Sequence, residues 1–290
     1  MITLFVWSLF MYNRNFNKHT TLEELKKIPK ARSLVSFLQI ALLPVGSTMY
    51  VYGGGWNEAD TGAGIEAVTL GLSPKWAEFA SIQDASYDHT KYRYQIHKGL
   101  DCSGYVGWVL YNTLEEESGC AGYVMPAACM AETFATWGFG TFLPQEKEKD
   151  FLPGDIVSMK DHVWISLGTC QDGSVVLVHA SPPGVSLCGT TLPTIEGEAE
   201  KKSQAVCLVE KYMQIYFPEW YKRYPNCSRG SFYKTESSVM RWDNKVLADP
   251  DGVQCMSPER LLALLLNNSK NNRWKNYQIC DTIEKMSVFK

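Results

Sequence analysis

The chain has 290 residues, a length that accommodates one large domain with extensions or two smaller domains. Hydrophobic residues make up 45% of it and charged residues 20%, a composition that is typical of globular proteins and excludes fibrous and low-complexity chains. The formal net charge of -3 offers no chain-wide basic field to a phosphate backbone, so nucleic acid is not an expected partner.

No apolar run reaches the roughly 18 residues of a membrane-spanning helix, so an integral membrane span is not expected. Residues 1–12 have the length of the apolar part of an export signal. They lack a preceding Lys or Arg and a following small-x-small cleavage motif. This segment is therefore either an atypical or truncated export signal, or a segment that packs on the domain.

The first third of the chain predicts two helices, a short strand and an insert. Residues 20–30 begin with a threonine cap, and residues 31–43 repeat apolar side chains at i, i+3, i+4 and i+7. A β-rich stretch then runs into glycines 53–55, where the backbone must turn sharply or lie against another segment. Residues 57–99 show no sustained periodicity and would form either a lid over a site or a plain surface elaboration.

In the middle of the chain the pattern changes from helix to strand. Residues 101–117 predict a helix with one apolar face and Asp101 as its N-cap, and residues 126–137 predict a further helix. Strands are predicted over residues 152–159, 162–170 and 174–180, the last two joined by a hairpin.

Beyond residue 207 the chain is predicted to be helical and aromatic. The aromatic residues between Tyr212 and Tyr224 would either cover the core or stack on sugar rings of a glycan. Ser257 and Pro258 predict the cap and first turn of a final helix.

Cys102 is the strongest candidate for chemistry, because it lies at the start of the helix that Asp101 caps. The unpaired N–H groups and the helix dipole at this end favour an ionised thiol and could hold an oxyanion. Gly104 would leave room for a substrate backbone. The alternative is that Cys102 is a small buried hydrophobic residue, as most cysteines are.

A thiolate nucleophile needs a proton-transfer partner, and His162 and His179 bracket the predicted hairpin. With a two-residue turn, His179 would face Ser166, on the same face of the sheet as His162. Contact between the two histidines would then require a bulge or a stagger. Each histidine alone is explained by a structural role, but together with a helix-start cysteine they indicate a catalytic set. The histidines of the chain are His19, His89, His97, His162 and His179.

Four ordered blocks of the sequence resemble the NlpC family of papain-like cysteine peptidases, which cut bacterial cell-wall peptides. They are MYVYGGG at 49–55, DCSGYVGWVLY at 101–111, LPGDIV at 152–157, and DHVWISLG at 161–168 followed by VHASPPGV at 178–185. The resemblance covers roughly residues 31–190. Met49 and Tyr52 stand where the family has Pro and Trp, and the spacing between Gly55 and Cys102 is unusually long.

The resemblance implies an α+β papain-like domain whose nucleophile helix packs on an antiparallel sheet. It makes Cys102 the nucleophile, His162 the general base and later acid, and His179 the residue that orients His162. By the same resemblance, Tyr50 would support the oxyanion. Asp101 and Ser103 would shape the end of the cleft that receives the substrate.

The implied activity is hydrolysis of a peptidoglycan stem peptide or muropeptide between γ-D-glutamate and the diamino acid, through an acyl-enzyme and without a metal or cofactor. Titration of Cys102 and His162 would give a bell-shaped rate profile. The implied organisation is an N-terminal segment at 1–30, a catalytic domain at 31–206 with the insert at 57–99, and a helical extension at 207–290. A protein of this family would act in the cell wall or outside the cell, although cytoplasmic muropeptide recycling fits as well.

Three alternatives to this function remain open. A papain-like amidase or acyltransferase would use the same nucleophile on another amide or ester. A wall-binding module without turnover would have no need of Cys102 and His162, which are both present. A zinc site made of Cys102, His162 and His179 has suitable ligand types but no tight ligand spacing. The nine cysteines include no CxxC pair, and their odd number leaves at least one thiol free.

Overall fold

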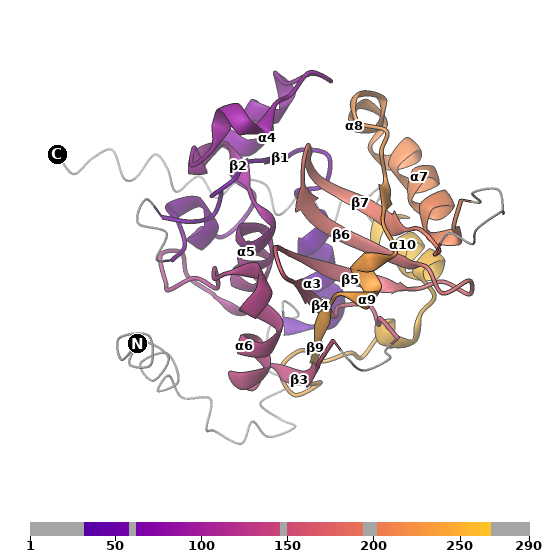
Figure 1. Ribbon diagram of the computed structural model, residues 1–290. Coiled ribbons are helices and arrows are strands. Elements are labelled where there is room, and N and C mark those ends of the chain that lie inside the picture. The colour runs from indigo at the N-terminus through magenta and orange to yellow at the C-terminus, as the bar shows by residue number, and fades with distance from the viewer. Residues whose placement is uncertain (1–31, 58–61, 146–149, 194–201, 268–290) are drawn as a thin grey trace.

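The computed structural model describes residues 32–57, 62–145, 150–193 and 202–267 (Figure 1). The predicted helix at 20–30 and the apolar segment at 1–12 lie outside these residues. The described chain is a mixed α/β structure built on a large, mostly antiparallel sheet, which confirms the expected class at this level. None of its helices is both long enough and apolar enough to cross a membrane.

The sheet has nine strands in the order β2-β1-β7-β6-β5-β4-β9-β3, and β8 pairs with β7 beside this path. The strands are β1 (Met49–Tyr50), β2 (Gly99–Leu100), β3 (Gly140–Leu143), β4 (Ile156–Met159), β5 (His162–Thr169), β6 (Val175–Ser181), β7 (Gly184–Thr190), β8 (Ser228–Arg229) and β9 (Ser238–Trp242). The strands predicted at 152–159, 162–170 and 174–180 correspond to β4, β5 and β6.

The predicted helices of the described chain are all present. The α-helices are α3 (Leu34–Leu42), α4 (Pro74–Ser81), α5 (Cys102–Leu114), α6 (Met130–Thr136), α7 (Gln204–Tyr216), α8 (Pro218–Arg223), α9 (Phe232–Thr235) and α10 (Pro258–Asn267). Short 3-10 turns are η2 (Ile65–Val68), η3 (His89–Tyr92), η4 (Ile96–Lys98), η5 (Ala127–Cys129) and η6 (Val253–Cys255). The main core lies between one face of the sheet and helices α3, α5, α6, α7 and α10.

The opposite face of the sheet carries a smaller apolar cluster around Trp164, Leu177 and Tyr233 of α9. Because side chains alternate along a strand, His162 lies on the same face as Trp164, and His179 on the same face as Leu177. Both candidate histidines therefore belong to the face of the sheet that α9 covers.

The prediction that residues 207–290 form a helical extension is wrong, because β9 pairs with both β4 and β3 inside the main sheet. Val239 of β9 belongs to the smaller cluster and Met240 to the main core, so the strand is buried on both faces. A strand covered on both faces has no alternation of apolar and polar residues to reveal it. The same holds for β7, every residue of which is buried and which the sequence patterns did not predict.

Helix α5 runs through the core, and Asn112 is its one residue that is not buried. The sequence predicts a single apolar face for it. The structure instead encloses it on all sides, between α3, the η2 turn of the insert and strands β5 and β6. A helix enclosed in this way holds its N-terminus in a fixed position.

A bulge in β5 sets the register of the hairpin. Leu167 is the extra residue, because Ser166 pairs with Leu177 and Gly168 already pairs with Val176. Gly168 has a φ of 107°, and its N–H donates to Oγ of Ser166 at 3.0 Å. A side chain there would be strained.

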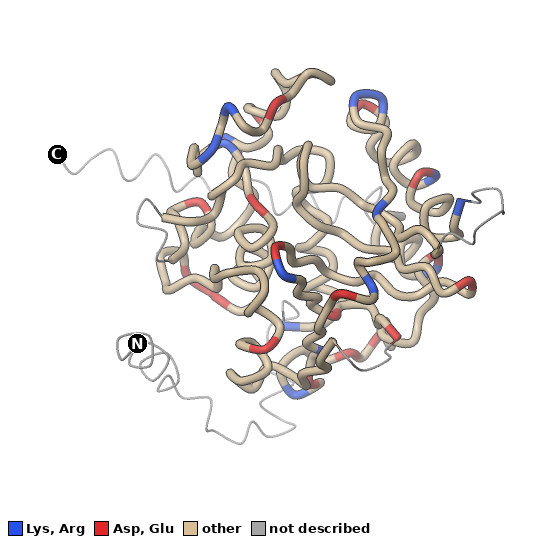
Figure 2. Tube along the Cα trace, viewed as in Figure 1, with Lys and Arg blue, Asp and Glu red and all other residues tan. Residues whose placement is uncertain are grey.

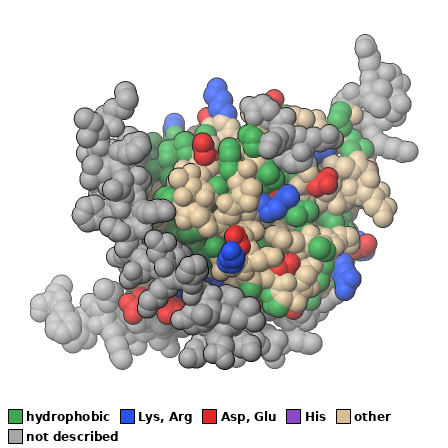
Figure 3. All heavy atoms as spheres, turned by 90° about the horizontal axis from the view of Figure 1, so that it is seen from below, with side chains coloured by type: hydrophobic (Ala, Val, Ile, Leu, Met, Phe, Trp, Pro, Cys, Tyr) green, Lys and Arg blue, Asp and Glu red, His purple; other side chains and the backbone are tan. Residues whose placement is uncertain are grey.

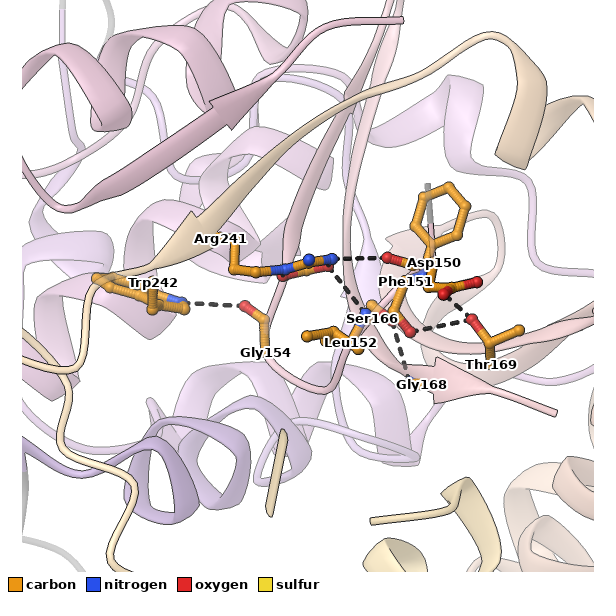
Figure 4. Close-up of polar contacts among 10 residues, drawn as sticks. Asp150, Phe151, Leu152, Gly154, Ser166, Gly168, Thr169, Arg241 and Trp242 are labelled. Carbon is orange, nitrogen blue, oxygen red and sulfur yellow. Dashed lines mark hydrogen bonds and ion pairs between the residues drawn. The ribbon is translucent and has the colours of Figure 1, made fainter. Parts of the chain in front are cut away.

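The LPGD turn supports this bulge, as Figure 4 shows. The Gly154 N–H donates to the Ser166 carbonyl at 2.8 Å, and the Trp242 indole N–H donates to the Gly154 carbonyl at 3.0 Å. Arg241 of β9 donates to both carboxylate oxygens of the fully buried Asp155, at 3.0 and 2.8 Å. The turn, the bulge and β9 are thus one hydrogen-bonded unit.

Charged residues of both signs are interspersed along the helices and loops (Figure 2). The face seen from below shows single Lys, Arg, Asp and Glu side chains among apolar ones (Figure 3). On that face the described residues form no single-sign patch. The surface thus agrees with the near-neutral composition of the chain.

Candidate active site

The glycine turn lies directly on the first turn of α5. A Cβ added at Gly104 would run into the backbone of Gly54, and one added at Gly55 would lie 2.5 Å from Cα of Gly104. The expectation that the three glycines lie against another segment is therefore confirmed. The sequence analysis expected Gly104 to leave room for a substrate backbone. This expectation is wrong, because the glycine turn fills the space beside Gly104.

Asp101 joins the glycine turn to the start of α5. One carboxylate oxygen accepts from the Gly104 N–H at 2.7 Å and the Ser103 hydroxyl at 2.9 Å, and the other accepts from the Gly53 N–H at 3.1 Å. The Ser103 hydroxyl in turn accepts from the Trp56 indole at 3.0 Å. Both polar side chains that flank Cys102 are engaged inside the protein, and their contact with a substrate stays a prediction.

Cys102 is the first residue of α5 and only 7% exposed. Burial, and next the Asp101 carboxylate, raise the pKa of its thiol to about 12, although hydrogen bonds from the N–H groups of Val163 and Ser103 act the other way. The expectation that the helix start favours a thiolate is wrong for this site, because the loss of water outweighs the helix N–H groups. The hydrogen bond from Val163 places the sulfur at the start of β5, beside His162.

His162 and His179 are hydrogen-bonded to each other, with Nε2 of His162 and Nδ1 of His179 2.8 Å apart. The predicted pairing of His179 with Ser166 is wrong, because Leu177 takes that place. The hairpin turn includes Gln171 and is therefore one residue longer than predicted, which shifts the pairing of β5 with β6 by one residue. The bulge at Leu167 shifts the pairing by one residue more. Continuing the observed register places His179 opposite Trp164. Two shifts of one residue keep His179 on the predicted face and bring it within reach of His162.

Two residues of this site were missed by the sequence analysis. Nε of Arg229 donates to Nε2 of His179 at 3.2 Å. The ring of Tyr233 meets both histidines edge to face, at centroid distances of 5.6 Å from His162 and 6.1 Å from His179. Burial raises the pKa of Tyr233, the Arg229 guanidinium lowers it, and the two side chains share a hydrogen bond.

Both missed residues come from the segment that was interpreted as a helical extension. Strand β8 pairs in parallel with β7 and thereby brings Arg229 to the site. In this pairing Arg229 lies opposite Thr190. No local pattern around residues 228–233 marks a strand of two residues or a helix of one turn. Only the tertiary pairing reveals their role.

Burial keeps both histidines neutral. It lowers the pKa of His162 to about 3, and the Arg229 guanidinium acts in the same direction. The pKa of His179 is also lowered, by burial first and then by Arg229 and His162. Between the pKa values of His162 and Cys102, the unliganded site therefore holds a neutral thiol and a neutral imidazole.

Tyr50 lies beside the nucleophile. Burial raises the pKa of its hydroxyl, and the Cys102 and Asp101 side chains raise that pKa further, so the hydroxyl stays a hydrogen-bond donor. Residues of the insert support it: the Tyr87 hydroxyl donates to the Tyr50 carbonyl at 2.7 Å, and the His89 ring lies 5.6 Å away, edge to face. The insert is thus packed on β1 and on the neighbourhood of Cys102.

The described residues contain no group of three or more His, Cys, Asp or Glu side chains that is arranged to hold a metal ion. His162 and His179 contact each other, Arg229 and Tyr233 contact this pair, and the N–H of Val163, the residue after His162, donates to Cys102. Comparisons with protein-family models, with curated proteins and with solved structures give no match for this chain.

Proposed function

We propose that this chain is a papain-like cysteine peptidase of the NlpC type that hydrolyses peptidoglycan stem peptides between γ-D-glutamate and the diamino acid. The observation that carries the proposal is the hydrogen bond between His162, at the start of β5, and His179 of β6, next to Val163, whose N–H donates to the Cys102 sulfur. A nucleophile, a base and an orienting group in this order are the parts of a thiol hydrolase.

In the proposed reaction the thiol of Cys102 attacks the amide carbonyl while its proton passes to Nδ1 of His162. The two steps are concerted, because neither an isolated thiolate nor an isolated imidazolium is stable in so dry a site. Nδ1 is the nitrogen concerned, since Nε2 is bonded to His179. His179 holds the ring in place during the transfer.

The tetrahedral intermediate needs hydrogen-bond donors for its oxyanion. The N–H groups at the start of α5 and the hydroxyl of Tyr50 are the donors that we assign to it. Collapse of the intermediate breaks the C–N bond, and His162 returns the proton to the leaving amine. Water then attacks the thioester, gives a proton to His162, and releases the carboxylic acid and the Cys102 thiol.

The chemistry of the substrate rests on the sequence resemblance and needs a direct test. Defined muropeptides are incubated under reducing conditions with the wild type, with Cys102→Ala and with Cys129→Ala, and the products are identified by mass spectrometry. Cys129 is an exposed free cysteine and serves as the matched control. Fragments that end in D-glutamate, formed by the wild type and C129A but not by C102A, support the proposal.

Intact muropeptides in all three samples would contradict the substrate. Selective loss of an amide or ester from other acyl donors in a parallel panel would then favour an amidase or acyltransferase with the same nucleophile. Cleavage by C102A would contradict the nucleophile itself.

A further inference from the structure

Arg229 is a half-buried cation without an acidic partner among the described residues. It donates through Nε to His179 at 3.2 Å and through Nη1 to the Ser228 carbonyl at 2.7 Å, and it also hydrogen-bonds to the side chain of Tyr233. The ion pairs of the described chain involve other cations, namely Lys75, Lys91, Lys202, Lys211 and Arg241. A guanidinium so placed beside a candidate active site is suited to bind a carboxylate of a ligand.

The contact with Arg229 also fixes where the protons of the two histidines lie. A guanidinium can only donate, so Nε2 of His179 must accept. A neutral imidazole that accepts at Nε2 carries its proton on Nδ1, and from there His179 donates to Nε2 of His162. His162 therefore carries its own proton on Nδ1, the nitrogen that is left for Cys102.

This arrangement has no base for the thiol. Nδ1 of His162 is already protonated and cannot accept the proton of Cys102. An imidazolium at His162 is excluded too, because its Nε2–H would face the Nδ1–H of His179 across 2.8 Å. The low pKa values of both histidines, to which Arg229 contributes, point in the same direction.

We propose that Arg229 holds the site in an inactive tautomer, and that a carboxylate of the substrate activates it by drawing the guanidinium away from His179. His179 then carries its proton on Nε2 and accepts at Nδ1 from Nε2 of His162, which leaves Nδ1 of His162 free to act as the base. Each ring holds one proton before and after the change, so the exchange with water consumes and releases none.

The carboxylate that fits this role belongs to the substrate class of the proposed function, on which this inference rests. An amide made through the γ-carboxyl of glutamate leaves the α-carboxylate free, close to the bond that is cut. Arg229 would thus select substrates with a free carboxylate near the scissile amide. A substrate that lacked it would meet an inactive His162.

The test is ¹⁵N NMR of the full chain with ¹⁵N-labelled histidine, in which protonated and unprotonated ring nitrogens have well-separated shifts. His162→Asn and His179→Asn assign the signals. The unliganded wild type is expected to show unprotonated Nε2 and protonated Nδ1 in both rings. R229M is expected to lose this preference, and R260M to keep it, because Arg260 is exposed and, unlike Arg229, does not contribute to the pKa shift of either histidine.

A second arm uses C102A, which lacks the proposed nucleophile and is expected to bind a ligand without turnover. A γ-D-glutamyl dipeptide with a free α-carboxylate is expected to move the protons of both rings to Nε2, and its α-carboxamide analogue is expected to leave them on Nδ1. This arm needs no change at Arg229 and decides the question even if R229M does not fold.

Protonated Nε2 in the unliganded wild type, tautomers in R229M identical to the wild type, or an equal response to the carboxamide would each overturn the proposal. Neither arm depends on turnover. If the histidines show the expected tautomers but the muropeptides stay intact, the results support the role of Arg229 and contradict only the proposed function.

Discussion

The hydroxyl of Ser166 accepts a hydrogen bond from the backbone N–H of Gly168 at 3.0 Å, across the bulge of β5. Without the bulge, the pairs Thr169–Val175 and Gly168–Val176 would continue until His179 lay opposite Ile165, on the face of the sheet away from His162. A single extra residue therefore decides whether the two histidines can meet.

Gly168→Ala is expected to weaken this bulge. The φ of 107° is unfavourable for any side chain, and a Cβ would lie 3.3 Å from Pro153, so we expect a loss of about 1–3 kcal/mol in the free energy of unfolding and a fall in activity. Gly173→Ala is the control, with a φ of 78° in the hairpin turn and no atom within 4 Å of its Cβ. Equal loss of activity in both variants would contradict the role of the bulge.

His179→Ala is expected to lower kcat by about 10²- to 10⁴-fold, as when the orienting member of a catalytic triad is lost. KM should change little, because His179 is fully buried beneath His162 and does not reach a substrate. Steady-state kinetics on the muropeptide substrate give both constants. His97→Ala, at an exposed histidine, is expected to match the wild type, and a loss confined to KM in H179A would contradict the assignment.

The reactivity of Cys102 toward iodoacetamide should keep rising with pH. A pKa of about 12 means that the thiolate fraction increases about tenfold for each pH unit below that value. The rate at Cys102, followed by peptide mass spectrometry, is expected to show no plateau between about pH 5 and 9, whereas a small-molecule thiol levels off above its pKa of roughly 8.5. A plateau near neutral pH would show a preformed thiolate and contradict the neutral pair.

The bell-shaped rate profile expected from the sequence stays a prediction, and the same pKa values widen it. The acidic limb of the pH–rate profile is expected near the His162 pKa of about 3, and the alkaline limb near the Cys102 pKa of about 12. Neither limb then falls in the range where such profiles are usually measured.

Arg241→Met should destabilise the fold without touching the chemistry directly. It leaves the carboxylate of Asp155 buried and without its cation, which costs about 3 kcal/mol, the lower end for buried pairs because 28% of the Arg241 side chain is exposed. Denaturant unfolding measures the loss, with R260M as a control of equal charge change at an exposed site. A loss below that of the control would contradict the structural role of this ion pair.

The sequence was sufficient to predict features that depend on local physics. The N-cap at Asp101, the apolar period of α3 and the close contact of the three glycines each follow from a few neighbouring residues. The position of Cys102 at the start of a helix was predicted in the same way.

Features set by tertiary pairing could not be predicted. Strand β9 shows no alternation because both of its faces are buried, and Arg229 reaches His179 only through the pairing of β8 with β7. The direction of the thiol pKa shift also depends on burial, which no motif encodes.

The proposed reaction depends on a covalent acyl-enzyme that Cys102 forms with the help of His162. The most direct test is to quench the reaction of the wild type with a γ-D-glutamyl ester substrate in acid and to map the protein by mass spectrometry. We expect the acyl mass on the peptide that carries Cys102, with little or none in H162A and none in C102A. Substrate turnover without an adduct on Cys102, or an adduct on another residue that survives in C102A, would contradict it.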